Sequence, residues 1–307
     1  MRKIIEFHEN GVIFLKTLIR EKTFKKQIFP ILLLLPCLIL FCTFCFYPFL
    51  KTIYLSFFLT KVNGETVKFV GFANFVRVLK SNDFKNSVMV SFKFAGLVCI
   101  FSVLFGGILA LIACEKGKGS RIYEVLFSLP MAVASVPAAA IWMILLSQGS
   151  GVVNWLLGLD IGWLTNPKYA LYAVAAVTVW LRVGVNFIFL LTGFRNVPGD
   201  LLESARIDGA NYFQRLFKIV LPMASPQIFF VVFLAIVNSF QTFGQIKILT
   251  AGGPSNSTNV LINSIYMKAL VENRFESACV QSLVLFLIIF VITRIQFVFE
   301  KKVVHYE

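Results

Sequence analysis

Six long apolar runs dominate the sequence and limit the folds that it can adopt. They lie at about residues 29–50, 88–114, 122–146, 169–191, 219–243 and 277–298. A helix needs about 20 apolar residues to cross the hydrocarbon of a bilayer. Each run is long enough for one crossing. The sequence therefore predicts an all-α, polytopic membrane protein with six transmembrane helices.

The segments between the runs are too short to hold a separate soluble domain. The whole chain is 58% hydrophobic and contains 34 phenylalanines, which no ordinary soluble domain shows. We expect a basic N-terminal segment at 1–27, a six-helix membrane domain at 28–302 and a tail at 303–307. The domain includes a long outer loop at about 51–86 and a polar loop at about 196–222.

The net charge of +14 is a signal of membrane topology. A basic chain can bind nucleic acid, but these charges flank the apolar runs, so we predict no nucleic-acid partner. Lys116, Lys118 and Arg121 crowd one short loop, whereas residues 147–167 carry no Lys or Arg. Positive charge marks cytosolic loops. Both termini and the polar loop are therefore predicted to be cytosolic.

The polar loop is predicted to form two short helices, with a break between them at Gly209. Asp200 and Glu203 would lie near the positive end of the first helix dipole. Glycine can adopt the left-handed conformation that ends a helix. Apolar residues form one stripe on each predicted helix. On these features alone the loop could still be an ordinary surface connection.

A longer pattern in the loop resembles a known motif. It is Glu-x-Ala-x-x-x-Gly at 203–209, followed by Ile-x-Leu-Pro at 219–222. This pattern resembles the coupling loop of binding-protein-dependent ABC importer permeases, which have the MetI-like fold. Its Ile-Asp-Gly-Ala form is typical of the carbohydrate-uptake branch, although Ser204 stands where that family usually has Ala. The residues that the resemblance assigns to ATPase coupling are Glu203, Ser204, Ala205, Asp208, Gly209, Ala210, Leu221 and Pro222.

The resemblance also implies partners for the chain. They are a cytosolic ABC ATPase dimer, a second homologous permease subunit and an extracytoplasmic solute-binding protein. Residues 69–75 resemble an outer segment of the same family, which could contact the binding protein or simply be solvated. The chain itself lacks a phosphate-binding loop, because Ile112 stands where the Gly-x4-Gly-Lys pattern ending at Lys118 needs its first glycine. We therefore expect no cofactor on this chain, and ATP to be used by the partner.

Polar side chains inside the runs are candidates for a substrate pathway. Arg182 and Asn186 are four residues apart, hence on one helical face. Asn238, Gln241 and Gln245 have spacings that would place them on one face of a helix in the fifth run. Amides can bind the hydroxyls of a sugar, which both donate and accept. Both groups could instead make contacts between helices.

Prolines inside the third run also shape the predicted path of the chain. In the third run, Pro130 and Pro137 predict a bent path through the membrane. Small residues around them would allow close helix packing or a pathway.

Three classes of function compete for such a chain: an importer permease, a secondary transporter or channel, and a membrane-embedded enzyme. The two histidines, His8 and His305, lie near the termini, and the run interiors lack Asp and Glu. No catalytic or metal site is predicted, which argues against an enzyme and against a proton-coupled carrier. The prediction is a sugar importer permease in a bacterial cytoplasmic membrane. A glycerol-3-phosphate or polyol importer permease is the alternative, partly because Arg182 suits a phosphate, and a secondary transporter ranks below both.

Overall fold

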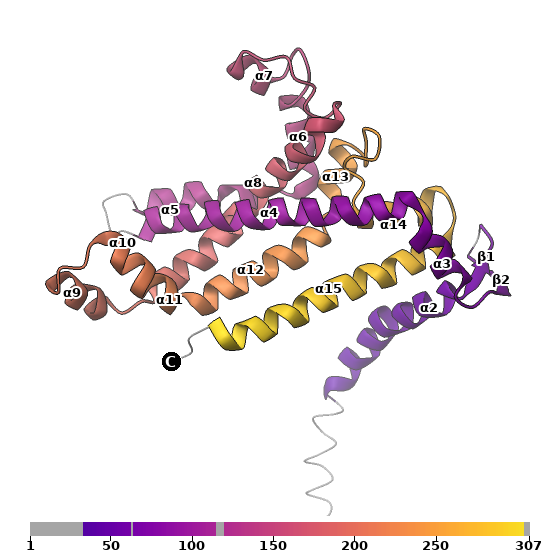
Figure 1. The fold of residues 1–307 in the computed structure, drawn as a ribbon, viewed down its shortest axis with the longest axis horizontal. Helices are drawn as coiled ribbons and strands as arrows, with labels where there is room; N and C mark the ends of the chain where they lie inside the picture. Colours follow the sequence, from indigo (N-terminus) through magenta and orange to yellow (C-terminus); the bar gives the residue numbers. More distant parts are fainter. Residues whose placement is uncertain (1–32, 63, 115–119, 304–307) are drawn as a thin grey trace, which may run out of the picture. The chain divides into compact units, whose positions relative to one another are not determined.

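The structure is a computed structural model that describes residues 33–62, 64–114 and 120–303. These residues form mostly helices (Figure 1). The chain divides into two units, Met1–Tyr54 and Leu55–Glu307. The predicted N-terminal segment at 1–27, most of the short basic loop and most of the C-terminal tail lie outside the described residues.

The first unit contains one described helix, which starts at Leu33 and runs on to Ser56. Its α-helical hydrogen bonding is interrupted by a π-helical turn, η1 (Cys42–Phe46), before α2 (Tyr47–Ser56). Pro48 lies just after this turn. A proline ring lacks an N–H and collides with the carbonyl four residues earlier in a regular helix. We attribute the wider turn to this conflict. The helix corresponds to the first predicted span.

Three further spans are continuous helices of the second unit. They are α4 (Asn82–Cys114), α8 (Pro167–Arg195) and α15 (Phe275–Val303). Each contains a predicted apolar run and extends beyond it, because backbone hydrogen bonding continues past the apolar boundary. Asn166 caps the start of α8 by accepting a hydrogen bond from the Lys168 N–H, and Pro167 occupies the first turn, where its missing N–H costs little.

The remaining two spans are bent. In the third, α5 (Ser120–Ser128) and the 3-10 turn η2 (Leu129–Ala132) meet α6 (Ser135–Leu145) at 95°. Pro130 lies in that turn and cannot continue the α-helical hydrogen bonding. The predicted bent path is confirmed.

In the fifth span, the segment Tyr212–Met223 meets α12 (Ser225–Phe240) at 70°. That segment consists of α10 (Tyr212–Arg215), the π-helical η3 (Leu216–Val220) and α11 (Leu221–Met223). Counting each bent pair as one span, the described residues contain the six crossings that the sequence predicts.

The connections carry short elements. The predicted outer loop holds a two-stranded antiparallel hairpin, which the sequence analysis did not foresee, in which Phe58 pairs with Phe69. The elements of the connections are β1 (Phe58–Thr60), β2 (Thr66–Phe69), α3 (Ala73–Lys80), α7 (Val152–Leu157), α9 (Gly199–Ile207), α13 (Gly244–Leu249), α14 (Leu261–Tyr266) and η4 (Met267–Val271).

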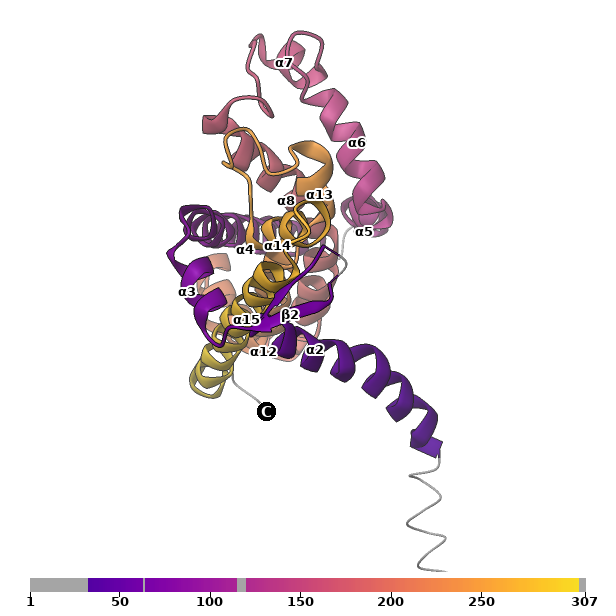
Figure 2. The same ribbon diagram turned by 90° about the vertical axis from the view of Figure 1, so that its right-hand side faces the viewer.

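Within the second unit, the connections gather at opposite ends of the long helices. The hairpin, α3 and α14 lie at one end of α4 and α15, and α9 and α10 lie at the other (Figure 1). Figure 2 shows α6 and α7 on the side of α8 away from α15. The loop around Gly209 is therefore separated from the predicted outer loop by the length of the spans.

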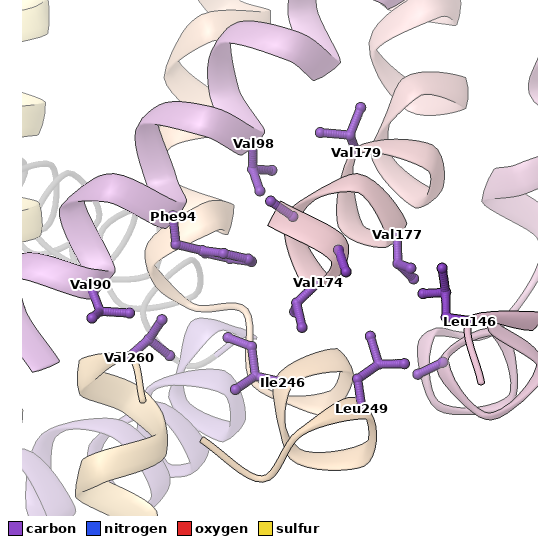
Figure 3. Close-up of a cluster of buried hydrophobic side chains, with 13 residues drawn as sticks. Val90, Phe94, Val98, Leu146, Val174, Val177, Val179, Ile246, Leu249 and Val260 are labelled. Atoms are coloured by element: carbon purple, nitrogen blue, oxygen red, sulfur yellow. The ribbon is translucent and has the colours of Figure 1, made fainter. Parts of the chain in front are cut away.

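A buried apolar cluster joins α4, α8 and α13. Val90, Phe94 and Val98 of α4 lie beside Val174 of α8 and Ile246 of α13 (Figure 3). The two long helices approach closely farther along, where a Cβ on Gly106 would lie 2.9 Å from the Asn186 Cβ. Glycine is therefore needed at this crossing. The cluster fixes α13 against both helices and so positions the polar segment that precedes it.

Candidate coupling loop and substrate pocket

The polar loop folds around Gly209. Helix α9 ends at Ile207, and Gly209 has a φ of +77°, the left-handed conformation that side chains disfavour. Its N–H donates to the Arg206 carbonyl at 3.1 Å, and the Ala210 N–H donates to the Ala205 carbonyl at 2.9 Å. These bonds close the end of the helix. The predicted break is confirmed at this residue.

The second helix of the loop begins with a capping box. The Asn211 Oδ1 accepts from the Gln214 N–H, and the Gln214 Oε1 accepts from the Asn211 N–H, both at 2.8 Å. Arg215 adds a hydrogen bond from its guanidinium to the Ala210 carbonyl at 2.8 Å. The joint is therefore fixed on both sides of Gly209. The Asn-x-x-Gln spacing is a known helix-start signal that the sequence analysis did not use.

The predicted coupling residues fall into two groups. Those on α9 and the turn are exposed or half-buried, and Leu221 and Pro222 lie in α11, beyond the π turn. Ile207 is 87% exposed beside Asp208, which is also exposed. Contiguous exposed apolar surface often marks a protein contact. The large apolar side chains exposed on the loop are Leu201, Ile207, Tyr212, Phe213 and Phe217.

Arg195 connects the loop to two other spans through an ion pair and a hydrogen bond. Arg195, the last residue of α8, donates to the Glu124 Oε1 of α5 at 2.6 Å and to the Ala113 carbonyl of α4 at 3.1 Å. The second bond satisfies one of the carbonyls that every helix leaves open at its C-terminal end. The root of the loop is thus attached to the second and third spans at a single side chain.

A pocket of about 650 Å³ lies between the loop and these helix ends. Its lining includes Arg195, Arg206 and Arg215 together with Leu202 and Leu216. The loop therefore borders this pocket and also has an exposed surface.

The prediction that Asn238, Gln241 and Gln245 share one face of a helix in the fifth span is wrong. Helix α12 ends at Phe240, so Asn238 lies in that helix, Gln241 lies in the break after it, and Gln245 belongs to α13. A three-then-four spacing places residues on one face only while the helix continues. Here the Gln241 N–H donates a hydrogen bond to the Asn238 carbonyl, three residues earlier, at 3.2 Å, and the helix ends.

The break nevertheless brings several predicted residues to one pocket. This pocket, called here the substrate pocket, has a volume of about 370 Å³ and lies between α8, the bend of the third span and the segment that follows α12. Gln245 is buried, whereas Gln241 is exposed and Arg182 is partly exposed. The residues that line the pocket are Met131, Val133, Ser135, Leu181, Arg182, Val185, Gln241, Thr242, Phe243, Gly244 and Gln245.

Two predicted pathway residues lie elsewhere. Asn186 is buried against Gly106 at the crossing of α4 and α8, and it is not among the residues that line the substrate pocket. Asn238 is half-buried, and its carbonyl accepts from the Thr242 hydroxyl at 3.0 Å. Asn186 therefore matches the alternative prediction of a helix contact better than a pathway role.

The outer hairpin is held by a polar network that the sequence analysis missed. The Glu276 carboxylate, 8% exposed, accepts from the Thr60 hydroxyl at 2.7 Å and from the Arg77 guanidinium at 3.1 Å. The Asn74 amide donates to the Ser56 and Phe58 carbonyls, both at 2.9 Å. Only long-range contacts in the fold reveal this pairing, because Arg77 and Glu276 lie far apart in the sequence. The network attaches the hairpin and α3 to α15.

Comparison with known proteins agrees with this architecture. The family model described as "Binding-protein-dependent transport system inner membrane component" matches residues 102–305. The chain is 33% identical, over 290 residues, to the sn-glycerol-3-phosphate transport system permease protein UgpA of Agrobacterium fabrum, covering 92% of this chain and 98% of that protein. It is 34% identical to the protein of the same name from Pectobacterium atrosepticum, with the same coverage of each chain.

Solved structures show the same fold. A bacterial ABC transporter involved in the import of the acidic polysaccharide alginate matches with a TM-score of 0.82 at 23% identity, over 92% of this chain and 99% of that chain. The MetNI methionine ABC transporter matches with a TM-score of 0.56 at 14% identity, over 73% and 97%. The MetI-like fold predicted from the loop motif is confirmed.

The family match also decides between the classes of function that the sequence left in competition. It is a family of transport components and not of enzymes, and its description places it in the inner membrane. The predicted importer permease with several membrane spans is thereby confirmed. The chain belongs to the family of inner membrane components of binding-protein-dependent transport systems.

Proposed function

We propose that this chain is one of two related permease subunits of an ATP-driven importer, and that the loop at 196–222 couples it to a separate cytosolic ATPase dimer. A periplasmic binding protein would deliver the solute to the opposite end of the spans. ATP is bound by the ATPase, and this chain binds no cofactor. The loop and both termini lie in the cytosol in this proposal, in keeping with the charged loop around Lys116.

The observation that carries the proposal is the exposed two-helix loop. Its Gly209 joint is held by hydrogen bonds on both sides, and several of its apolar side chains, Ile207 above all, are exposed. An exposed apolar surface on an ordered joint suits a protein partner. Glu203 and Asp208 would supply charged contacts beside it.

The mechanism follows from how the loop is attached. Closure of the ATPase dimer on ATP would move α9 and α10 as one body. Arg195 would pass this movement to α4 and α5 through its bonds to Ala113 and Glu124. The bend of the third span and the segment that follows α12 both line the substrate pocket, so a tilt of these two spans would change access to it. The loop must be bound differently in the two ATPase states, since otherwise ATP could not shift the equilibrium.

For the solute we propose a sugar or a polyol derivative. The relatives are named for sn-glycerol 3-phosphate. A structural neighbour is described in complex with an alginate pentasaccharide-bound periplasmic protein. Gln241 and Gln245 at the substrate pocket could bind hydroxyl groups. The second candidate, a glycerol-3-phosphate-type importer, is favoured by Arg182 in the same pocket.

The experiment is reconstitution in proteoliposomes. This chain is purified with the second permease, the ATPase and the binding protein of its proposed importer, and solute uptake is measured with ATP, with a non-hydrolysable analogue, and with an imposed proton or sodium gradient. We expect uptake only with ATP and only with all subunits present. Uptake by this chain alone, or uptake that follows an ion gradient, would contradict the proposal.

A further inference from the structure

An unpaired arginine lies at the substrate pocket. Arg182 is in the middle part of α8 and lines the pocket together with Gln241 and Gln245. Its guanidinium forms no hydrogen bond or ion pair with any residue of the described ranges 33–62, 64–114 and 120–303. A charge at this depth of a membrane span is costly unless it is paired or hydrated, and such residues mark functional pathways.

Three cations elsewhere in the described chain have clear partners. Arg195 pairs with Glu124 at one end of the spans, and Arg77 pairs with Glu276 at the other. Lys247, in α13, lies 4.7 Å from the centre of the Tyr266 ring. Arg182 differs from these three, because no partner is found for it within the described residues.

The surroundings of Arg182 are polar but carry no opposite charge. Among the described residues that line the pocket, Arg182 alone is charged. The Thr242 hydroxyl donates to the Asn238 carbonyl at 3.0 Å, which leaves its oxygen lone pairs available as acceptors. The Gln245 side chain is 5% exposed and makes no hydrogen bond within the described ranges. The pocket thus combines one positive charge with groups that can bind hydroxyls.

A neutral solute would not need this charge. Amides and hydroxyls bind a neutral sugar without the cost of desolvating a guanidinium. A guanidinium is matched to the planar fork of a carboxylate or the oxygens of a phosphate, with two parallel hydrogen bonds. Charge and geometry therefore favour an anionic group beside Arg182.

We propose that Arg182 binds an anionic group of the transported solute, a phosphate or a carboxylate, while Gln241 and Gln245 bind the hydroxyls next to it. This inference rests on the proposed function, because it takes the pocket to be part of the transport pathway. The pocket volume of about 370 Å³ is near the lower end of ligand pockets, roughly 300–1,000 Å³. It suits a small sugar acid, a sugar phosphate or one residue of a longer acidic chain.

The test compares matched charged and neutral solutes on the purified complex of this chain with its second permease and its ATPase. The probes are sn-glycerol 3-phosphate against glycerol, and glucuronate against glucose. A ligand that binds the folded state raises the thermal midpoint of unfolding in a concentration-dependent way. The shift therefore reports binding without any need for transport.

For the wild-type complex we expect the anionic member of at least one pair to reach half of its maximal shift at a concentration about tenfold lower than its neutral partner, as a charged hydrogen bond predicts. Arg182→Gln should abolish this difference. Arg182→Lys should keep part of it, because an ammonium retains the charge without the fork. Lys168→Gln removes one positive charge from the exposed start of the same helix, and it should behave as wild type.

Three outcomes would overturn the inference. The first is a wild-type complex with no preference for the anion in either pair, including no shift with any probe. The second is a preference that survives Arg182→Gln. The third is an Arg182→Gln chain that no longer assembles with the second permease while Arg182→Lys does, which would assign the arginine to an acidic residue of that subunit. The ATP dependence of uptake judges the proposed function separately, because it does not depend on the charge of the solute.

Discussion

Replacement of Gly209 by proline tests the joint of the loop. The φ of +77° at this position is open to glycine, whereas proline is locked near −65°. Proline also removes the N–H that donates to the Arg206 carbonyl, a bond worth about 1 kcal/mol. It further disfavours the helical conformation of the preceding residue, Asp208. The joint therefore cannot form in its present geometry.

Alanine at the same position supplies the matched comparison. A left-handed conformation costs a residue with a Cβ about 1–2 kcal/mol. No atom lies within 4 Å of the place where that Cβ would be, so no steric cost is added. We expect Gly209→Ala to keep most of the transport, with a lower thermal midpoint at most, and Gly209→Pro to abolish it. Both variants should reach the membrane normally, because the substitution lies outside the spans.

The assay measures ATP-driven uptake in proteoliposomes, together with the amount of ATPase that co-purifies with the permease. Gly158→Pro is a control for the proline itself, because Gly158 also has a left-handed φ, +63°, with no atoms near its Cβ position. It lies after α7, in the segment 147–167 whose lack of Lys and Arg contrasts with the cytosolic loops, and should retain the ATPase. Full ATP-driven uptake by Gly209→Pro would refute the view that this joint transmits force.

Three further variants probe the contacts around the loop and the hairpin. Arg195→Gln breaks a half-exposed ion pair, so the free energy of unfolding should fall by no more than about 1 kcal/mol. In the same variant, ATP hydrolysis should become uncoupled from solute uptake. The charge exchange Arg195→Glu with Glu124→Arg should restore part of the coupling, and a full loss of stability with no rescue would contradict the proposed role. Asn211→Ala removes the capping box and should cost about 1 kcal/mol of helix stability, seen as faster amide hydrogen exchange in α10 but not in α9; unchanged exchange would contradict it. Glu276→Gln leaves the Arg77 charge without its partner and should lower the free energy of unfolding by about 1–3 kcal/mol, measured by thermal unfolding in detergent, with exposed Glu65→Gln as the unaffected control.

Much of the fold could be predicted because membrane helices leave a strong signal. Each apolar run corresponds to one crossing, since the bilayer requires a minimum length of apolar helix. The break at Gly209 could also be predicted, because left-handed backbone geometry and glycine are closely linked. Pro130 likewise predicted a bent third span, because proline cannot continue helical hydrogen bonding.

The candidate site was harder to predict. Spacing alone placed Asn238, Gln241 and Gln245 on one helix, but spacing does not reveal where a helix stops, and α12 ends at Phe240. The segment from Gln241 to Phe243 contains no proline or glycine that would have marked the break. The pocket depends on packing between the bend of the third span, α8 and the segment that follows α12, which no local pattern encodes.

The contacts at the two ends of the spans depend on the fold in the same way. Arg195 and Glu124 come from different spans, and Arg77 of the connecting helix α3 pairs with Glu276 of α15. Each pair is brought together only when the helices have packed. The short strands of the hairpin, at three and four residues, are also weak signals in a chain dominated by apolar helices.

The central claim is that the loop around Gly209 contacts an ATPase in the cytosol. The direct measurement is photo-crosslinking in intact cells, with benzoylphenylalanine in place of Ile207, which is 87% exposed, and in place of Val62 on the outer hairpin as the control. We predict that the Ile207 position forms a covalent product with the ATPase, that its yield changes when ATP and vanadate trap the closed dimer, and that the Val62 position forms none. An ATPase product from Val62, or a product from Ile207 with an external protein only, would contradict the account.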